Sequence, residues 1–204
     1  MLRLENLSKS YDNHPVFQGL NYTFKPGCYA LCEEDSTGKS TLLAVIAGAL
    51  SPTAGDVWID EHSLGQTPQQ AKARLAYIPE NCLQFPLMTG RELLEQAAAE
   101  KNTAIDEAVL DAAQRLDLTE HLDKRFEQMS TGMRRKVYLC AAALGQAAVI
   151  VADGPTNGLD GSACKALAQL FKTWGQNRVV LFASYDTDWV QSCGASMLEV
   201  GALR

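Results

Sequence analysis

A strand, a loop and a helix in direct succession constrain this chain more than any other feature of its sequence. The apolar segment 29–32 precedes a polar loop, and the stretch 39–48 (KSTLLAVIAG) has a helical composition that ends on a glycine. The run 37–41 (TGKST) therefore stands at a predicted helix N-terminus. Unpaired backbone amides, a lysine and hydroxyls at such an end suit a polyphosphate and its Mg²⁺.

The residues of this run predict separate roles in a phosphate site. Lys39 would reach the β and γ phosphates, and Ser40 would bind Mg²⁺. Thr41 and the backbone amides of 37–41 would hold the α and β phosphates.

A chance occurrence on a surface helix is the alternative interpretation. A strict phosphate-loop pattern has glycine at the position where this chain has Glu33. Asp153 decides between the two, because it follows four apolar residues and predicts a strand end that delivers a carboxylate to the Mg²⁺.

Length and charge bound the class of protein. A chain of 204 residues is long enough for one well-buried domain and too short for two, so residues 1–204 are expected to form a single domain. The net charge of −6 argues against nucleic acid as a partner, although the basic run 134–136 could form a patch on one helix. No run approaches the roughly 20 apolar residues that span a bilayer. We therefore expect a cytoplasmic chain that reaches a membrane only through a partner.

The first part of the chain has the pattern of β-structure. Residues 2–32 hold β-like segments around 2–6, 16–24 and 28–32, separated by turn signals, which predicts an antiparallel β subdomain. Further strands are expected near 57–59 and 75–79.

The second part alternates between helical and strand patterns. Thr89 and Glu92 form a capping box ahead of a helix, and a block without strand signals extends to about Leu144. Strands return near 149–152 and 178–183 with a helical stretch between them, which is the βαβ rhythm of a buried parallel sheet. The pattern predicts an α/β fold with an all-helical insert.

Seven landmarks extend the phosphate signal along essentially the whole chain. They are Tyr11, the loop 33–41, SPTAGDVWID at 51–60, AYIPE at 76–80, MSTGM at 129–133, AVIVAD at 148–153 and NGLD at 157–160. In this order they resemble the ABC ATPase family. The resemblance implies a P-loop NTPase core with a mostly parallel sheet, an N-terminal antiparallel β subdomain and an inserted α-helical subdomain at about 85–145.

The resemblance also implies which residues would hold ATP and Mg²⁺. Tyr11 would stack on the adenine, although alone it is as well explained as a packing aromatic. The implied nucleotide-binding residues are Tyr11, Ser36, Thr37, Gly38, Lys39, Ser40, Thr41 and Asp153, and the implied Mg²⁺ ligands are Ser40, Glu80 and Asp153.

A second group of residues would act on the nucleotide of another subunit. In the family, the signature addresses the γ-phosphate of ATP bound to the other copy, with the positive end of its helix dipole directed at the charge. Here these residues are Ser130, Thr131, Gly132 and Met133, with Asp160 in the D-loop. The alternative for Ser130 and Gly132 is a simple N-cap and turn.

Four departures from the family pattern lie where the nucleotide or its attacking water would be. Gly154 stands at the position of the catalytic glutamate, and Tyr185 at that of the switch histidine, so no catalytic residue is intact. Glu33 and Ser36 replace two loop glycines, and Glu80 takes the place of the Q-loop glutamine. The pattern predicts that hydrolysis is impaired more than binding.

The resemblance implies the ATP-binding subunit of an ABC transporter, as a homodimer or as a heterodimer with another ABC ATPase subunit. A transmembrane permease subunit would dock against the exposed-looking residues 85–87 and hold the chain on the inner face of the cell membrane. A small exporter-type subunit, like that of haem exporters, is one subfamily that fits the short length. The alternatives are a soluble ABC protein outside transport and a catalytically dead regulatory pseudo-ATPase.

Overall fold

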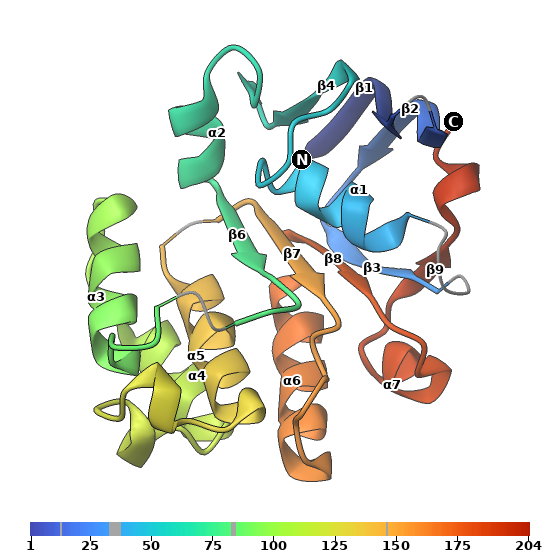
Figure 1. The fold of residues 1–204 in the computed structure, drawn as a ribbon. Helices are drawn as coiled ribbons and strands as arrows, with labels where there is room; N and C mark the ends of the chain where they lie inside the picture. Colours follow the sequence, from blue (N-terminus) through green and yellow to red (C-terminus); the bar gives the residue numbers. More distant parts are fainter. Residues whose placement is uncertain (13, 33–37, 83–84, 146) are drawn as a thin grey trace.

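Two sheets and the helices around them make up the fold (Figure 1). The computed structural model describes residues 1–12, 14–32, 38–82, 85–145 and 147–204. A four-stranded antiparallel sheet lies beside a five-stranded parallel sheet, with most of the helices below the parallel sheet in Figure 1. The predicted α/β class, with an antiparallel β part and a helical part, is confirmed.

The antiparallel sheet is formed by the amino-terminal part of the chain. Its strand order is β2-β1-β4-β5, and its strands are β1 (Leu2–Tyr11), β2 (His14–Phe24), β4 (Ala54–Ile59) and β5 (His62–Ser63). Leu2 and Leu4 of β1 point into the core while Arg3 between them is partly exposed. This alternation is what one buried face requires of a strand.

The parallel sheet carries strands from distant parts of the sequence. Its order is β6-β7-β8-β3-β9, with β6 (Leu75–Ile78), β7 (Val149–Asp153), β8 (Val179–Ala183), β3 (Gly27–Leu31) and β9 (Ser196–Leu198). Every residue of β7 and β8 is buried. Both strands therefore consist almost entirely of apolar residues, as expected of a sheet covered on both faces.

One predicted strand belongs to a different sheet from the one expected. The segment around 28–32 was expected to complete the antiparallel part, but β3 pairs in parallel with β8 and β9. The backbone of Gly27 hydrogen bonds to Arg178 just before β8 and starts this pairing. Local sequence indicates a strand but not its partner, which is decided by residues about 150 positions away.

The two faces of the parallel sheet contribute to two separate cores. Val149 and Val151 pack with α1 (Lys39–Ile46) and the antiparallel sheet. Ile150 and Ala152, which alternate with them, pack with the helices on the opposite face. The sheet thereby holds α1 on one side and the helical layer on the other.

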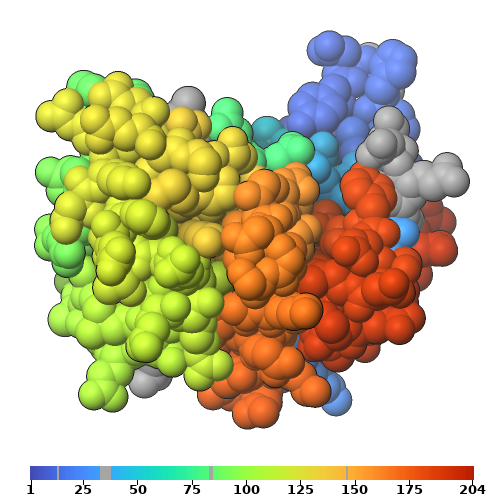
Figure 2. All heavy atoms as spheres, turned by 90° about the horizontal axis from the view of Figure 1, so that it is seen from below, coloured from blue at the N-terminus to red at the C-terminus, as the bar shows by residue number. Residues whose placement is uncertain are grey.

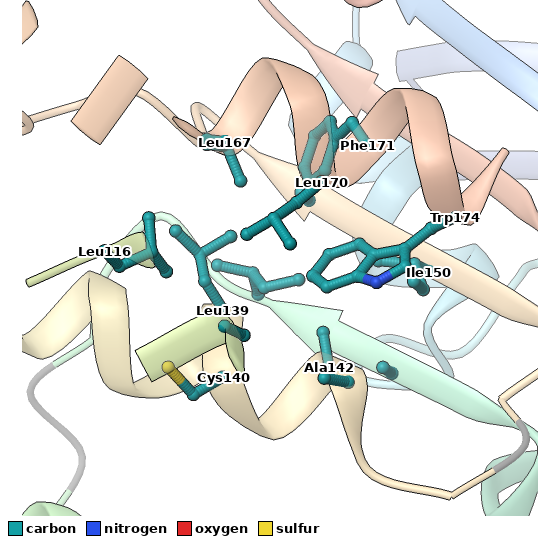
Figure 3. Packing of buried hydrophobic residues seen from close by; sticks show 14 of the residues in the cluster. Leu116, Leu139, Cys140, Ala142, Ile150, Leu167, Leu170, Phe171 and Trp174 are labelled. Carbon is teal, nitrogen blue, oxygen red and sulfur yellow. The ribbon is translucent and has the colours of Figure 1, made fainter. Parts of the chain in front are cut away.

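The helical layer packs tightly under the parallel sheet. Figure 3 shows Leu139 of α5 (Thr131–Ala143) and Trp174 of α6 (Gly161–Trp174) around Ile150 of the sheet. Seen from below in Figure 2, α6 lies between the helical block on one side and the carboxyl-terminal segment with α7 (Thr187–Ser192) on the other.

The described residues of 85–145 form helices and no named strand. They include α3 (Gly90–Glu100), α4 (Glu107–Arg115), α5 and the short 3₁₀ helices η1 (Thr119–His121) and η2 (Phe126–Gln128). Elsewhere in the chain lie α2 (Pro68–Ala73) and η3 (Val200–Ala202). Within the described ranges, no helix combines the length and the apolar character that crossing a bilayer requires.

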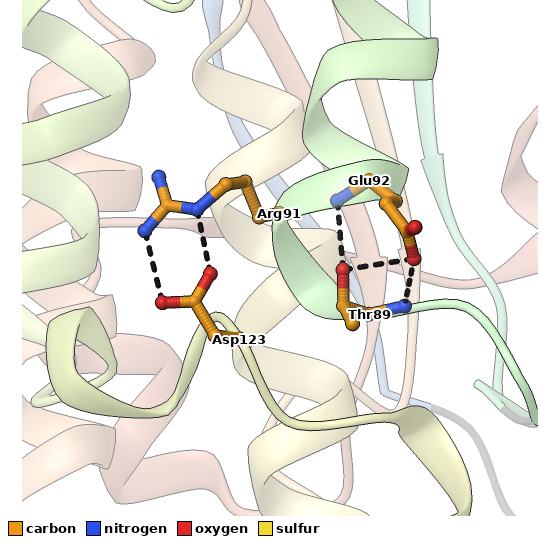
Figure 4. A network of polar contacts seen from close by, with 4 residues as sticks. All are labelled: Thr89, Arg91, Glu92 and Asp123. Carbon is orange, nitrogen blue, oxygen red and sulfur yellow. Dashed lines mark hydrogen bonds and ion pairs between the residues drawn. The ribbon is translucent and has the colours of Figure 1, made fainter.

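The capping box predicted from the sequence begins α3 (Figure 4). The Thr89 hydroxyl accepts from the Glu92 amide at 3.2 Å, and the Glu92 carboxylate accepts from the Thr89 amide at 2.7 Å. Arg91 and Asp123 form an ion pair beside it, with 2.7 Å between Nε and Oδ1. The first turn of α3 is thus fixed by its own sequence.

Two cations are buried close together near the amino ends of the parallel strands. Lys101 Nζ and Arg178 Nη1 are shielded from solvent and lack a hydrogen-bond partner in the described structure. Burial, with a smaller contribution from Arg178, lowers the pKa of Lys101 from 10.5 to about 8. The charged form of Lys101 therefore destabilises the fold.

We expect Lys101→Met to raise the free energy of unfolding at pH 7 by up to about 3 kcal/mol, the equivalent of the pKa shift. In the unsubstituted protein the cost of burying the Lys101 charge is complete below pH 8. It decreases between pH 8 and 10.5, where Lys101 has lost its proton in the folded state but keeps it in the unfolded state, and it is gone above pH 10.5. Urea unfolding of both proteins at several pH values measures the difference. Exposed Lys124→Met is the control, and a difference that persists unchanged at pH 10.5 would contradict the assignment.

Candidate functional site

The ends of two parallel strands bring the predicted phosphate residues together. Lys39 begins α1, which follows β3, and Asp153 is the last residue of β7. Strand β8 separates β3 from β7, so both positions lie at the carboxyl edge of one sheet. The Ser40 side chain hydrogen bonds to the Asp153 carboxylate. Two residues that are far apart in sequence and that were assigned to Mg²⁺ are therefore in contact.

A cavity of about 220 Å³ surrounds this contact. Other parts of its wall come from the loop residues 156–157, from the end of β8 and from residues 184–186 after it. The predicted residues that line it are Lys39, Ser40, Glu80, Asp153, Gly154 and Tyr185. It is large enough for a phosphate chain and a cation, while the rest of a nucleotide would lie outside it.

The charges in the cavity are arranged around Asp153. Burial raises the pKa of its carboxyl group, and Glu80 adds to this effect, while the hydrogen bond from Ser40 and the charges of Arg135 and Lys39 oppose it. Lys39 is 5% exposed, and its ammonium lies 4.7 Å from the centre of the Tyr185 ring. A cation bound beside this buried carboxylate would offset the cost of burying its charge.

The donor set fits a phosphate chain with Mg²⁺. A lysine and the N-terminus of α1 suit phosphate oxygens, and the Ser40 hydroxyl and the Asp153 carboxylate are hard oxygen ligands. Among the described residues there is no cluster of three or more His, Cys, Asp or Glu that could hold a metal ion. Mg²⁺ matches such a sparse set, because it takes one or two protein ligands and completes its shell with phosphate and water.

Several predicted residues lie away from the cavity or outside the described residues. Glu33, Ser36 and Thr37 belong to the undescribed part of the phosphate loop. Thr41 is half-buried in α1 and does not line the cavity. Tyr11 ends β1 at an exposed hairpin, where the Lys9 ammonium lies 5.0 Å from its ring centre. The structure thus leaves the adenine role of Tyr11 a prediction.

The backbone at Gly154 differs from that of an ordinary residue. Its φ of 53° lies in the left-handed region, and a Cβ added there would lie 2.4 Å from Asn157 Nδ2. Any L-residue at this position would be strained by roughly 1–2 kcal/mol and would also displace the Asn157 side chain. The position of the family's catalytic glutamate is therefore shaped for glycine in this chain.

The signature segment and the D-loop pack directly against each other. Ser130 caps α5 by accepting from the Met133 amide at 3.2 Å, so the simple N-cap alternative describes a real contact. A Cβ on Gly132 would lie 2.1 Å from the Gly158 carbonyl oxygen, so only glycine permits this approach. Asp160 caps α6, and hydrogen bonds from the Ser162 hydroxyl and the Ala163 amide lower its pKa to about 2.

Arg135 joins these segments, and sequence reasoning missed it. Its side chain is 1% exposed and donates hydrogen bonds to backbone carbonyls in the loop after β6, at the end of β7 and in the loop after β7. The acceptors within 3.1 Å are Glu80, Asp153 and Asn157, and Pro79 lies at 3.5 Å. Lys136 is 9% exposed, so a basic patch for nucleic acid over 134–136 is wrong. The local sequence carries no signal for this role, because all three acceptor carbonyls are distant in sequence.

The family follows from a comparison of the sequence with family models. The model described as ABC transporter matches residues 17–157, which include the phosphate loop and Asp153. The chain belongs to the ABC transporter ATP-binding family. Binding of ATP through a phosphate loop is the activity that unites this family.

Relatives of this cassette include transporters from bacteria and animals. It is 27% identical over 164 residues to the linearmycin resistance ATP-binding protein LnrL of Bacillus subtilis, covering 78% of this chain and 53% of LnrL. It is 31% identical over 165 residues to the sn-glycerol-3-phosphate import ATP-binding protein UgpC of Bartonella quintana, covering 78% of this chain and 47% of UgpC. Human ATP-binding cassette sub-family A member 13 is 27% identical over 98% of the cassette, which spans 4% of that protein.

Solved structures share the fold of the cassette over nearly its whole length. A structure described as the ATP-binding subunit of an ABC transporter superimposes with a TM-score of 0.88 at 23% identity, covering 98% of this chain and 86% of the other. The dimeric bacterial ABC transporter cassette MJ0796 gives 0.85 at 20% identity, covering 100% and 99%. At these identities the structural similarity shows a shared fold, and it does not assign the activities of those proteins to this chain.

Proposed function

We propose that this cassette binds ATP with Mg²⁺ in its own site, hydrolyses it poorly, and serves a membrane transporter. One observation carries the proposal. The cavity keeps the binding residues Lys39, Ser40 and Asp153. At Gly154, however, the left-handed backbone and the Asn157 side chain disfavour any residue with a Cβ, and so disfavour the glutamate that would activate water. The proposal treats residues 1–204 as one cassette with 85–145 as its helical subdomain.

The signature segment supports an additional role, in which the cassette completes the site of a partner ATPase. Ser130 and Gly132 begin α5, and the D-loop lies against them with Asp160 at the start of α6. Two helix N-termini therefore lie close together, and both favour negative charge. A partner copy or a related subunit could offer its nucleotide to this surface, as a homodimer or a heterodimer.

The docking of a transmembrane permease is supported by a second cavity. It measures about 330 Å³ and lies between the edge strand β6, α3 and α5. Phe85 lines it and is 43% exposed, and Leu87 nearby is 67% exposed, as the sequence predicted. Apolar side chains held in water beside a groove are typical of a surface that binds an apolar segment of another protein. This contact would keep the cassette at the inner face of the membrane.

Loss of the permease contact is expected from Leu87→Glu. A carboxylate in place of the exposed leucine would be buried against the apolar segment of the permease at a large desolvation cost, so co-purification of the multi-span membrane protein from detergent extract should fall at least tenfold. Leu110→Glu is the matched control, because Leu110 is 55% exposed on α4. Equal capture by the two variants would mean that the surface around Leu87 does not bind the permease.

Steady-state phosphate release by the purified chain tests the central activity. We expect turnover near background with Mg²⁺ and saturating ATP, because the general base is absent and such a base typically contributes about 10²- to 10⁴-fold. Lys39→Ala serves as the background, since it removes the predicted phosphate contact. Turnover of several per second that Lys39→Ala abolishes would refute the proposal.

A further inference from the structure

A cavity of about 490 Å³ lies at the opposite edge of the parallel sheet from the candidate nucleotide site. Its wall includes residues that come just before three neighbouring strands, namely Arg74 before β6, Ala148 before β7 and Arg178 before β8. The nucleotide site lies at the other ends of these strands. Because β7 and β8 are five residues long, roughly 15 Å of sheet separates the two places.

Positive charge exceeds negative charge around this cavity. The lining residues that the structure describes carry the Met1 amine, the guanidinium groups of Arg74 and Arg178, and the carboxylate of Asp60. That carboxylate is shared by two of the cations, since the amine and the Arg74 guanidinium each lie 2.6 Å from one of its oxygens. Three positive groups therefore surround one negative group, and the charge of Arg178 is left to be balanced by something else.

The guanidinium group of Arg178 has unused hydrogen-bonding capacity. Its Nη1 is shielded from solvent and has no hydrogen-bond partner within the described structure, and its Nη2 lies 3.5 Å from the Gly145 carbonyl oxygen. Burial lowers the pKa of Arg178, although the charge of Asp106 opposes this effect, and Lys101 is a second cation nearby. Because a guanidinium group stays charged, donors left in this state destabilise the fold until a negatively charged acceptor binds them.

We propose that this cavity is a second anion site, which binds a phosphate monoester through Arg178. The planar fork of an arginine matches two phosphate oxygens, and a monoester carries nearly two negative charges at pH 7, which suits the excess of positive groups. The volume lies within the range of small-molecule sites, roughly 300–1,000 Å³. A soluble phosphate ester and a lipid headgroup share this chemistry. The inference does not depend on the proposed nucleotide site, which lies at the other edge of the sheet.

Equilibrium dialysis with labelled inorganic phosphate at constant ionic strength tests the inference. Every protein carries Lys39→Ala, which removes the predicted phosphate contact of the nucleotide site. Adding Arg178→Met should weaken phosphate binding by about 10- to 100-fold, and Arg178→Lys, which keeps the charge without the fork, should fall between. Arg115→Met is the matched control on α4, where the arginine side chain is 50% exposed, and should leave binding within about twofold. Urea unfolding checks that each variant is folded.

Competition in the same dialysis distinguishes the two sources of the phosphate group. Displacement of the label by glycerol phosphate alone would support a soluble ester, and displacement by phosphatidic acid vesicles, but not by phosphatidylcholine vesicles, would support a lipid headgroup. Two results would overturn the inference: equal phosphate binding by the Arg178→Met and Arg115→Met proteins, or no binding of millimolar phosphate by the Lys39→Ala chain. Neither result bears on ATP binding, which is measured separately on the unsubstituted chain.

Discussion

Replacement of Arg135 by methionine is expected to lower the free energy of unfolding by about 3–5 kcal/mol. The guanidinium group is almost fully buried, and backbone carbonyls of Glu80, Asp153 and Asn157 accept its hydrogen bonds within 3.1 Å. Methionine fills a similar volume but leaves these carbonyls without a donor. A domain of this size has about 5–15 kcal/mol of stability in total, so the variant should be marginal.

Urea unfolding followed by circular dichroism measures this effect against a neighbouring arginine. Arg134 lies on the same helix and donates to one carbonyl, that of Phe126, at 2.7 Å. Arg134→Met should therefore cost only about 1 kcal/mol. If Arg135→Met does not fold, Arg135→Lys retains one donor group and should fall between the two. Equal losses for Arg134→Met and Arg135→Met would show that Arg135 does not join the loops.

The second large effect concerns a substitution that restores the family residue. Gly154→Glu supplies the carboxylate that the family uses, and a well-placed base would raise phosphate release by about 10²- to 10⁴-fold. For Gly154→Glu we expect phosphate release to rise by less than about 10-fold, well below this range. The backbone at φ 53° and the Asn157 side chain oppose any Cβ here, so the variant should also lose roughly 1–2 kcal/mol of stability.

Gly154→Ala separates the backbone effect from the carboxylate. It should lose the same stability as Gly154→Glu, because both place a Cβ beside Asn157. Phosphate release and urea unfolding are measured on the same preparations. A Gly154→Glu variant that is as stable as the unsubstituted chain and releases phosphate 100-fold faster would mean that the site lacks nothing but the carboxylate.

The sequence predicted best what depends on neighbouring residues. Periodicity and capping located α3 and its capping box at Thr89, and an apolar run ending in a carboxylate located β7 and Asp153. The order of the landmarks identified the family, which the family model confirms. The meeting of Lys39, Ser40 and Asp153 also followed, because phosphate-loop proteins place a carboxylate from a strand end beside the Mg²⁺ of the loop.

The features that sequence reasoning missed depend on contacts over long distances. Arg135 reads as part of a basic surface run, since nothing near it reveals the loops that it joins. β3 reads as part of an antiparallel unit until β8 is available to pair with it. In the sequence, Gly154 shows that the catalytic carboxylate is missing. It does not show that the backbone there is left-handed, a conformation that disfavours a glutamate.

The central claim is that the cassette holds intact ATP, and equilibrium dialysis against ATP labelled on both the α and the γ phosphate tests it most directly. With millimolar Mg²⁺ and ATP, the account predicts that the protein retains both labels in a one-to-one ratio over hours. It also predicts that Lys39→Ala retains neither. Recovery of the α label without the γ label would show hydrolysis at this site, and recovery of neither label by the unsubstituted chain would show that it does not bind ATP.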